Sequence, residues 1–139
     1  MNRTVESRLK PGVSWVEMHL LAERVLLAEL IKLGILKGDI KEMQEKRVPY
    51  LFMPHGLGHL LGLDTHDVGG YLKHTPERIM KPGLKNLRTS RVMQKGIIIT
   101  VEPGCYFIEF LLKKGGAAMV GIPTTYINYD KVWHECKYL

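Results

Sequence analysis

HGLGHLLGLDTHDVGGY, residues 55–71, places three histidines, two aspartates and five glycines in seventeen positions. Imidazole and carboxylate groups are the usual ligands of borderline divalent cations. Glycine lets the backbone, a metal and a substrate approach one another closely because it has no side chain. The stretch therefore predicts a metal site or an acid–base site built on exposed backbone. A complete metal site needs further ligands from elsewhere in the chain.

The five glycines argue against a helix in this stretch and favour strands and loops. His55 and His59 have the i, i+4 spacing of a zinc-binding helix, but the glutamate that follows the first histidine of that motif is absent. On a strand the same spacing also places both side chains on one face. His59 and His66 then face opposite ways unless the chain bends between them, and we expect that bend at Asp64-Thr65.

The segment before this stretch is predicted to be helical. Ser14-Trp15-Val16-Glu17 has the pattern of a capping box, and apolar residues follow at helical spacing. An amphipathic packing helix is therefore expected over residues 15–34. Asp39 can cap a shorter helix that runs through Arg47, because Pro49 prevents its continuation.

The segment after it contains the clearest predicted strand, the β-branched run at residues 97–102. This run ends in Glu102, and a charged side chain at the end of an apolar strand is costly to bury without a cation or another partner. Glu102 is therefore a functional candidate, and the alternative is an exposed glutamate at a strand end. Residues 113–116 are predicted to form a loop, residues 124–127 a strand or a helix start, and residues 133–139 an element without a cap.

Length and composition limit the kind of protein. A chain of 139 residues, 45% hydrophobic and 24% charged, suits one soluble globular domain. It has no apolar run near the roughly 20 residues of a membrane span and no apolar signal core, so a cytoplasmic location without a membrane partner is expected. The basic residues behind its net charge of +6 are scattered, which argues against nucleic acid. Cys105 and Cys136 lack CxxC spacing, so free or buried thiols are expected.

Four motifs in order carry a resemblance to a known family. They are PHGLGH at 54–59, HDVGGY at 66–71, LRT at 87–89 and TVEPGCYF at 100–107. Together they resemble the prolidase (Xaa-Pro dipeptidase) family of pita-bread metallopeptidases, which is related to aminopeptidase P, methionine aminopeptidase and creatinase. The resemblance covers roughly residues 10–112. It implies an α+β fold, a partial pita-bread half in which helices pack on one face of a curved, mainly antiparallel sheet.

The resemblance also implies roles for individual residues. His59 and Glu102 match metal ligands, and Glu102 also matches the group that moves the proton of the attacking water. His66 and Arg88 match substrate contacts; His66 could steady developing charge, and Arg88 could form a fork with the terminal carboxylate of the substrate. His66 as a cap of the bend and Arg88 as a solvated base remain alternatives. His55 is expected to support the ligands by hydrogen bonding, or to be an ordinary satisfied histidine.

The implied substrate is a dipeptide with C-terminal proline, and the implied cofactor is a pair of manganese ions, with cobalt or zinc as alternatives. Two such ions about 4 Å apart can share a hydroxide and polarise the scissile carbonyl. The family forms homodimers, so a second copy of the chain is an expected partner. Asp64 and Asp67 are treated as loop residues or as supports of the ligands, because the family pattern does not use them as ligands.

The chain departs from the family pattern in its ligand set. The family uses five protein ligands, two of which are aspartates that precede the first helix, but no aspartate precedes Asp39 here. The final glutamate has no counterpart, since Glu135 lies in an unrelated context. Residues 1–139 are therefore expected to form a single partial catalytic domain without the N-terminal domain of the family, as a fragment, a truncated isoform or a stand-alone protein.

Three of the five expected ligands are thus missing, and hydrolysis by this chain alone is expected to be impaired or absent. An alternative from another class is a non-catalytic pita-bread binding module. A third hypothesis is a mononuclear metal site made by His55, His59 and Glu102.

Overall fold

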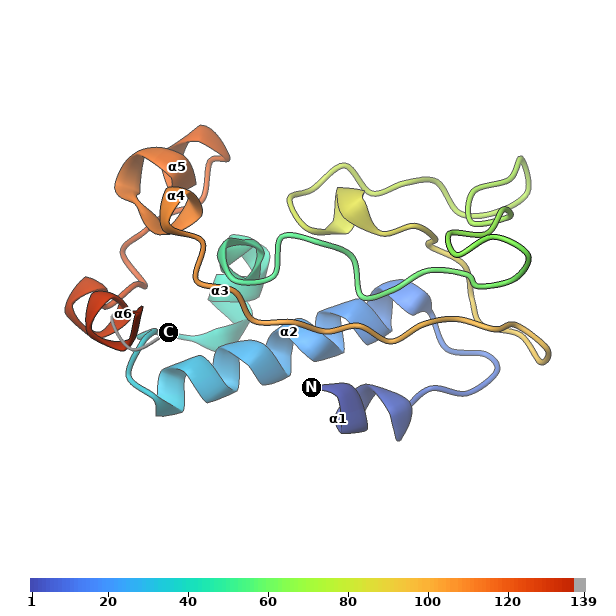
Figure 1. Ribbon diagram of the computed structural model, residues 1–139, viewed down its shortest axis with the longest axis horizontal. Coiled ribbons are helices and arrows are strands. Elements are labelled where there is room, and N and C mark those ends of the chain that lie inside the picture. The colour runs from blue at the N-terminus through green and yellow to red at the C-terminus, as the bar shows by residue number, and fades with distance from the viewer. Residues whose placement is uncertain (137–139) are drawn as a thin grey trace.

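The structure is a computed structural model that describes residues 1–136. Its first half holds helices α1 (Asn2–Glu6), α2 (Trp15–Lys32) and α3 (Ile40–Glu45) and the 3-10 turn η1 (Val48–Leu51). A second 3-10 turn, η2 (Leu84–Asn86), interrupts a long irregular region, and α4 (Glu109–Leu112), α5 (Lys114–Met119) and α6 (Tyr129–Cys136) follow. The long helix α2 runs beneath the extended segments that cross the middle of the molecule (Figure 1). No helix in the part of the chain described here is long and apolar enough to cross a membrane.

Helix α2 confirms the predicted packing helix to within two residues at its end. Ser14 is its N-cap residue, although its side chain makes no capping hydrogen bond, so the predicted capping box is not formed. The helix stops where Gly34 adopts a φ of 72°, and the amide of Ile35 then bonds to the carbonyl oxygen of Leu30 at 2.9 Å. A positive φ is readily available to glycine, which explains the stop at this point.

Helix α3 begins as predicted and ends earlier than predicted. The Asp39 side chain accepts a hydrogen bond from the backbone amide of Glu42 at 2.9 Å, which satisfies one of the amides left open at a helix start. The helix ends at Glu45 rather than Arg47, because Arg47 takes a left-handed backbone conformation with φ 61°. The chain therefore turns two residues before Pro49.

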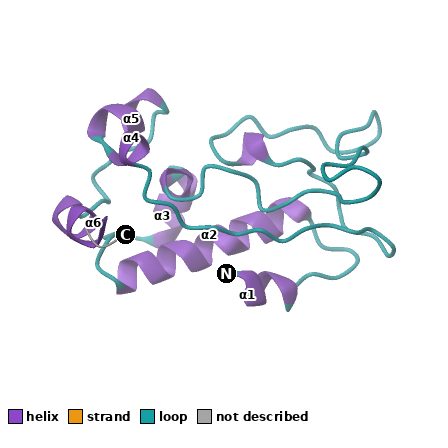
Figure 2. Ribbon diagram, viewed as in Figure 1, coloured by secondary structure: helices purple, strands orange, loops and turns teal. Residues whose placement is uncertain are grey.

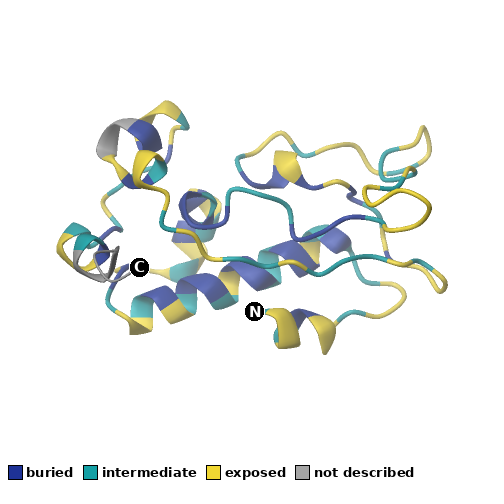
Figure 3. Cartoon of the chain, viewed as in Figure 1, coloured by how far each residue is buried: buried dark blue, intermediate teal, exposed yellow. Residues whose placement is uncertain are grey.

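Two hydrophobic clusters lie along α2. The larger one packs the C-terminal half of α2 against η1 and the C-terminal helices, and includes Leu27, Phe52 and Val132. The smaller one packs Trp15 at the start of α2 against Leu57 and other residues of the extended segments. Figure 3 shows the buried positions recurring along one side of α2. The extended segments thus pack against α2, which confirms the packing role predicted for this helix.

The predicted strand at residues 97–102 and the predicted curved sheet are absent from the part of the chain that the structure describes. Figure 2 shows helices and loops there without a strand, and the backbone pairs through isolated bridges only. Residues 57–61 and 98–102 nevertheless run antiparallel, with hydrogen bonds from the amide of Thr100 to the carbonyl of His59 at 2.9 Å and from Glu102 to Leu57 at 2.7 Å. We call these two segments the paired ribbon. Their pairing amounts to one isolated bridge, between Leu60 and Ile99, so no continuous strand ladder forms.

The C-terminal part differs from prediction at residues 113–116. The predicted loop is largely helical, since α5 begins at Lys114 directly after α4. Residues 124–127 contain a turn and one bridge, between Ile127 and Leu36, rather than a strand. Of the segment 133–139, α6 reaches Cys136, while residues 137–139 and the side chains of residues 134–136 lie outside the described part. Cys105 is a free thiol and is exposed, so the expectation of a free thiol is confirmed for it and that of a buried thiol is not.

Candidate active site

A pocket of about 600 Å³ lies beside the paired ribbon. It is lined by parts of the glycine–histidine stretch, by the residues around η2, and by the end of the second ribbon segment. All five residues singled out from sequence line it: His55, His59, His66, Arg88 and Glu102. Segments more than 40 residues apart in sequence therefore supply a single concave site.

His59 and Glu102 meet at the centre of this arrangement. The Nε2 atom of His59 lies 2.9 Å from Oε1 of Glu102, and the Nδ1 atom of His59 lies 2.9 Å from the carbonyl oxygen of Leu60. A carbonyl oxygen can only accept, so Nδ1 carries a proton and donates it to Leu60. In the neutral ring, Nε2 then presents a lone pair to a carboxylate oxygen. Two acceptors at this distance require a proton or a cation between them.

The backbone holds this pair in place. His59 and Glu102 lie on opposite segments of the paired ribbon, and the amide of His59 also donates to the side-chain oxygen of Thr100 at 3.0 Å. The side chain of His59 is 9% exposed and that of Glu102 is 53% exposed. The histidine is therefore fixed from inside the protein, whereas the carboxylate faces the open pocket.

His66 reaches the same place because the chain bends as predicted. The amide of Asp67 bonds to the carbonyl oxygen of Leu60 at 3.1 Å, which closes the loop between them. The rings of His59 and His66 lie edge to face, with centroids 4.3 Å apart. Asp64 is exposed in this loop, and Asp67 accepts a hydrogen bond from the amide of Val68 at 3.0 Å, so both serve as loop residues here.

His55 lies on another wall of the pocket. Its Nδ1 atom donates to the carbonyl oxygen of Gly56 at 2.8 Å, and its ring contacts Tyr106 edge to face at 5.3 Å between centroids. Its Nε2 atom is buried and has no hydrogen-bond partner among the described protein atoms. His55 therefore does not hydrogen-bond to His59 or Glu102 in the way predicted for a support of the ligands.

The pocket carries more positive than negative charge. Arg78 and Arg88 line it, and Glu102 is the single carboxylate among its lining residues. Arg78 lies 4.0 Å over the ring of Tyr71 and donates to the carbonyl oxygen of Lys85 at 2.8 Å, so its guanidinium is held in place. Fixed guanidinium groups favour ligands with a carboxylate or another anionic group.

Sequence reasoning missed Arg78, Asn86 and Tyr106 as pocket residues. Tyr106 lies inside the last of the four motifs and could have been found from it. Arg78 and Asn86 lie in an irregular segment without a motif, and only the fold brings them to the pocket.

The donor set does not make a closed metal centre. Across residues 1–136, no group of three or more histidine, cysteine, aspartate or glutamate side chains is placed to hold a metal ion. His59 and Glu102 lie 2.9 Å apart as a pair, whereas zinc sites, for example, take at least three protein ligands. The hypothesis of a mononuclear site made by His55, His59 and Glu102 is therefore wrong for this arrangement.

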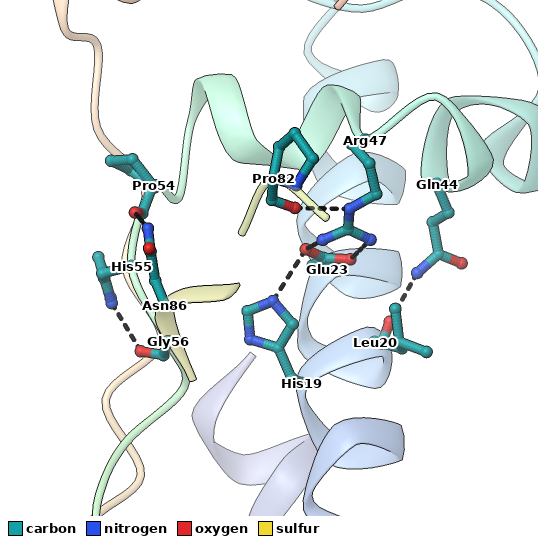
Figure 4. Close-up of polar contacts among 10 residues, drawn as sticks. All are labelled: His19, Leu20, Glu23, Gln44, Arg47, Pro54, His55, Gly56, Pro82 and Asn86. Atoms are coloured by element: carbon teal, nitrogen blue, oxygen red, sulfur yellow. Dashed lines mark hydrogen bonds and ion pairs between the residues drawn. The ribbon is translucent and has the colours of Figure 1, made fainter. Parts of the chain in front are cut away.

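A buried ionic cluster lies between α2 and the segment around η1 (Figure 4). His19 and Glu23 of α2 are fully buried, and Oε1 of Glu23 accepts a hydrogen bond from Nε2 of His19 at 2.9 Å. Arg47 forms a two-pronged ion pair with the same carboxylate, in which Nη1 lies 2.9 Å from Oε2. Burial raises the pKa of Glu23, but His19 and Arg47 outweigh it and bring the pKa below its ordinary value of 4.5.

This lowered pKa predicts a specific loss of stability in acid. A carboxyl group whose pKa is lower in the folded state stabilises the fold fully above its unfolded pKa, and the contribution disappears as pH falls through the folded pKa. The free energy of unfolding should therefore decline below the ordinary value of 4.5. Urea unfolding at a series of pH values should show that Glu23→Gln flattens this decline. The exposed, matched variant Glu29→Gln should leave it in place; an unchanged slope in Glu23→Gln would contradict the assignment.

Comparison with known proteins shows the family to which the chain belongs. The chain belongs to metallopeptidase family M24, whose sequence pattern matches residues 1–127. Among curated relatives, the Xaa-Pro dipeptidase of Rattus norvegicus is 54% identical over 110 residues, which is 79% of this chain and 22% of the relative. The Xaa-Pro dipeptidase of Homo sapiens is 53% identical over 111 residues, which is 80% of this chain and 22% of the relative. The resemblance to the prolidase family is thus confirmed.

The fold is similar to that of solved structures of aminopeptidase P. The zinc-substituted Escherichia coli enzyme in complex with product matches with a TM-score of 0.62 and 33% identity, over 91% of this chain and 23% of that chain. The His243Ala variant of the same enzyme gives the same values. This similarity supports the pita-bread assignment. The chain spans about a fifth of the length of these relatives, 22% for the rat dipeptidase.

Proposed function

We propose that this chain carries part of the active site of a metal-dependent Xaa-Pro dipeptidase. The observation that carries the proposal is the pair of His59 Nε2 and Glu102 Oε1, 2.9 Å apart in a pocket shared with His66 and Arg88. The hydrogen bond from Nδ1 of His59 to Leu60 selects the tautomer whose Nε2 can bind a metal. A divalent cation bound there would polarise the scissile carbonyl.

The remaining pocket residues suit a small anionic peptide. Arg88 is exposed and free to form a fork with the terminal carboxylate of a dipeptide, and Arg78 adds positive charge on the same side. His66, next to His59, is placed to hydrogen-bond a substrate oxygen on which charge develops. His55, with its unpartnered Nε2, offers a further hydrogen-bonding group to a ligand. These contacts favour a short peptide with a free carboxylate over a neutral ligand.

We further propose that these 139 residues do not complete the metal centre alone. The described part brings together His59 and Glu102 without a third donor, while the family pattern calls for five ligands. Manganese is the proposed ion, with cobalt or zinc as alternatives, because the donors are one imidazole and one carboxylate. We therefore expect weak metal binding at fewer than two equivalents and little or no dipeptide hydrolysis by the isolated chain.

The test combines metal stoichiometry with turnover. The purified chain is titrated with manganese and then with cobalt, and hydrolysis of a Gly-Pro dipeptide is followed. We expect His59→Ala to weaken the residual metal binding by about 10-fold or more, since even groups outside the ligand set contribute 10–100-fold. His74→Ala serves as the control, because His74 is exposed and outside the pocket lining. Two bound ions with turnover would refute the proposed incompleteness.

A non-catalytic binding module is the second candidate function. It is favoured by the absence of a third donor beside His59 and Glu102 among residues 1–136. A folded chain that binds neither manganese nor cobalt, yet still binds Gly-Pro, would support this candidate. Metal binding that His59→Ala abolishes would speak against it.

A further inference from the structure

We propose that the buried cluster of His19, Glu23 and Arg47 is a positioning element that sets the distance between two walls of the pocket. None of the three residues of the cluster is among the pocket-lining residues. It acts through two backbone carbonyl groups, those of Pro82 and Pro54. The inference rests on the proposed function only for the identity of the ligand; the mechanical link does not depend on it.

The first step of the link joins α2 to the segment before η2. Arg47 uses its Nη atoms for Glu23, and its Nε atom donates to the carbonyl oxygen of Pro82 at 2.8 Å. One planar guanidinium therefore fixes the position of residue 82 relative to α2 (Figure 4). A planar group bound on two edges leaves little freedom of rotation.

The next residue is a glycine whose backbone lies close to the Arg47 side chain. Gly83 has φ 81°, and a Cβ atom added there would lie 2.9 Å from Nη2 of Arg47. The backbone at Gly83 therefore approaches the guanidinium as closely as glycine permits. Turn η2 begins at the next residue, Leu84, so the position of Arg47 also sets the position of η2.

The second step joins η2 to the wall that carries His55. The side-chain amide of Asn86, at the end of η2, donates to the carbonyl oxygen of Pro54 at 2.6 Å. The backbone of the two segments is also in close approach, since a Cβ atom on Gly56 would lie 2.8 Å from the carbonyl oxygen of Asn86. His55 comes directly after Pro54, and Arg88 lies two residues after the end of η2. His55 and Arg88 both line the pocket. The chain of contacts thus runs from α2 through Arg47 and Asn86 to both walls.

The experiment is a double-mutant cycle read by NMR on the full 139-residue chain, without metal or substrate. Arg47→Lys keeps the positive charge but lacks the planar fork that bonds both carboxylate oxygens of Glu23 and the carbonyl oxygen of Pro82 from one rigid group. Asn86→Ala removes the outer link, and Asn86 is exposed, so the fold should tolerate its loss. We expect each variant to shift the backbone amide resonance of Gly56 beyond its line width. We expect the double variant to shift it no further than Asn86→Ala alone, because both act through one link.

A reciprocal measurement covers the case in which Arg47→Lys does not fold. Asn86→Ala should then shift the side-chain Nε–H resonance of Arg47, which reports its bond to Pro82. Lys85→Ala, an exposed position in the same turn, is the matched control and should leave both resonances in place. Additive shifts in the cycle, or an unmoved Arg47 resonance in Asn86→Ala, would overturn the positioning role. Failure to bind metal or to hydrolyse Gly-Pro bears on the proposed function alone.

Discussion

Replacing Arg47 with alanine is expected to lower the free energy of unfolding by about 3–5 kcal/mol. The change leaves the fully buried carboxylate of Glu23 with His19 as its remaining partner and leaves the carbonyl oxygen of Pro82 without its donor. An uncompensated buried charge costs several kcal/mol, which is a large part of the 5–15 kcal/mol that stabilises a typical domain. Urea unfolding followed by circular dichroism measures the difference.

Two comparisons make this prediction specific to the ion pair. Lys46→Ala removes a neighbouring exposed cation and should change the free energy of unfolding by no more than about 0.5 kcal/mol. Adding Glu23→Gln to Arg47→Ala should recover part of the loss, because a neutral amide is less costly to bury than an unpaired carboxylate. A loss below about 1 kcal/mol in Arg47→Ala would show that water reaches the cluster.

Replacing Gly58 with alanine is expected to cost about 3 kcal/mol or more and to separate His59 from Glu102. A Cβ atom at this position would lie 2.0 Å from the carbonyl oxygen of Thr100 on the facing segment. The obstacle is backbone, so the paired ribbon must open, and the 2.9 Å bond from the Thr100 amide to the carbonyl of His59 is lost with it. Urea unfolding gives the cost, and the imidazole NMR resonances of His59 report its distance from Glu102.

Gly96→Ala provides the comparison for Gly58→Ala. A Cβ atom on Gly96 meets nothing within 4 Å, but the backbone φ of 90° is unfavourable for alanine. This variant should therefore cost about 1–2 kcal/mol through backbone strain and leave the His59 resonances in place. If both variants cost the same and neither moves these resonances, close approach within the ribbon is not what holds the pair.

The features that depended on local sequence were predicted well. The helix at residues 15–34 follows from apolar spacing over many positions and matches α2 closely, and the Asp39 cap forms as expected. The bend between His59 and His66 follows from the polar Asp64-Thr65 pair, and the two rings meet at 4.3 Å. The motifs also identified five residues that line one pocket, although their roles remain predictions.

The strand at residues 97–102 was predicted from β-branched composition and is not formed. Composition shows that a segment fits a pleated surface, but a strand also needs a regular ladder of backbone hydrogen bonds to a neighbour, which the sequence of the segment does not specify. Here the segment pairs with residues 57–61 only. The prediction of a loop at residues 113–116 was wrong because it rested on the two glycines alone. Helix α5 packs Ala117 into the larger hydrophobic cluster, and this burial outweighs the low helix propensity of glycine.

The sequence by itself determined the family, the long helix and five of the residues that line the pocket, because each depends on short-range spacing or on contiguous motifs. The tertiary structure alone decided that Nε2 of His59 meets Glu102 at 2.9 Å, that Arg78 and Asn86 enter the pocket, and that Arg47 joins α2 to Pro82. These contacts join segments separated by tens of residues, and their geometry depends on how the paired ribbon and η2 pack on α2. Sequence spacing alone does not set such distances, whereas the close packing of the protein interior does.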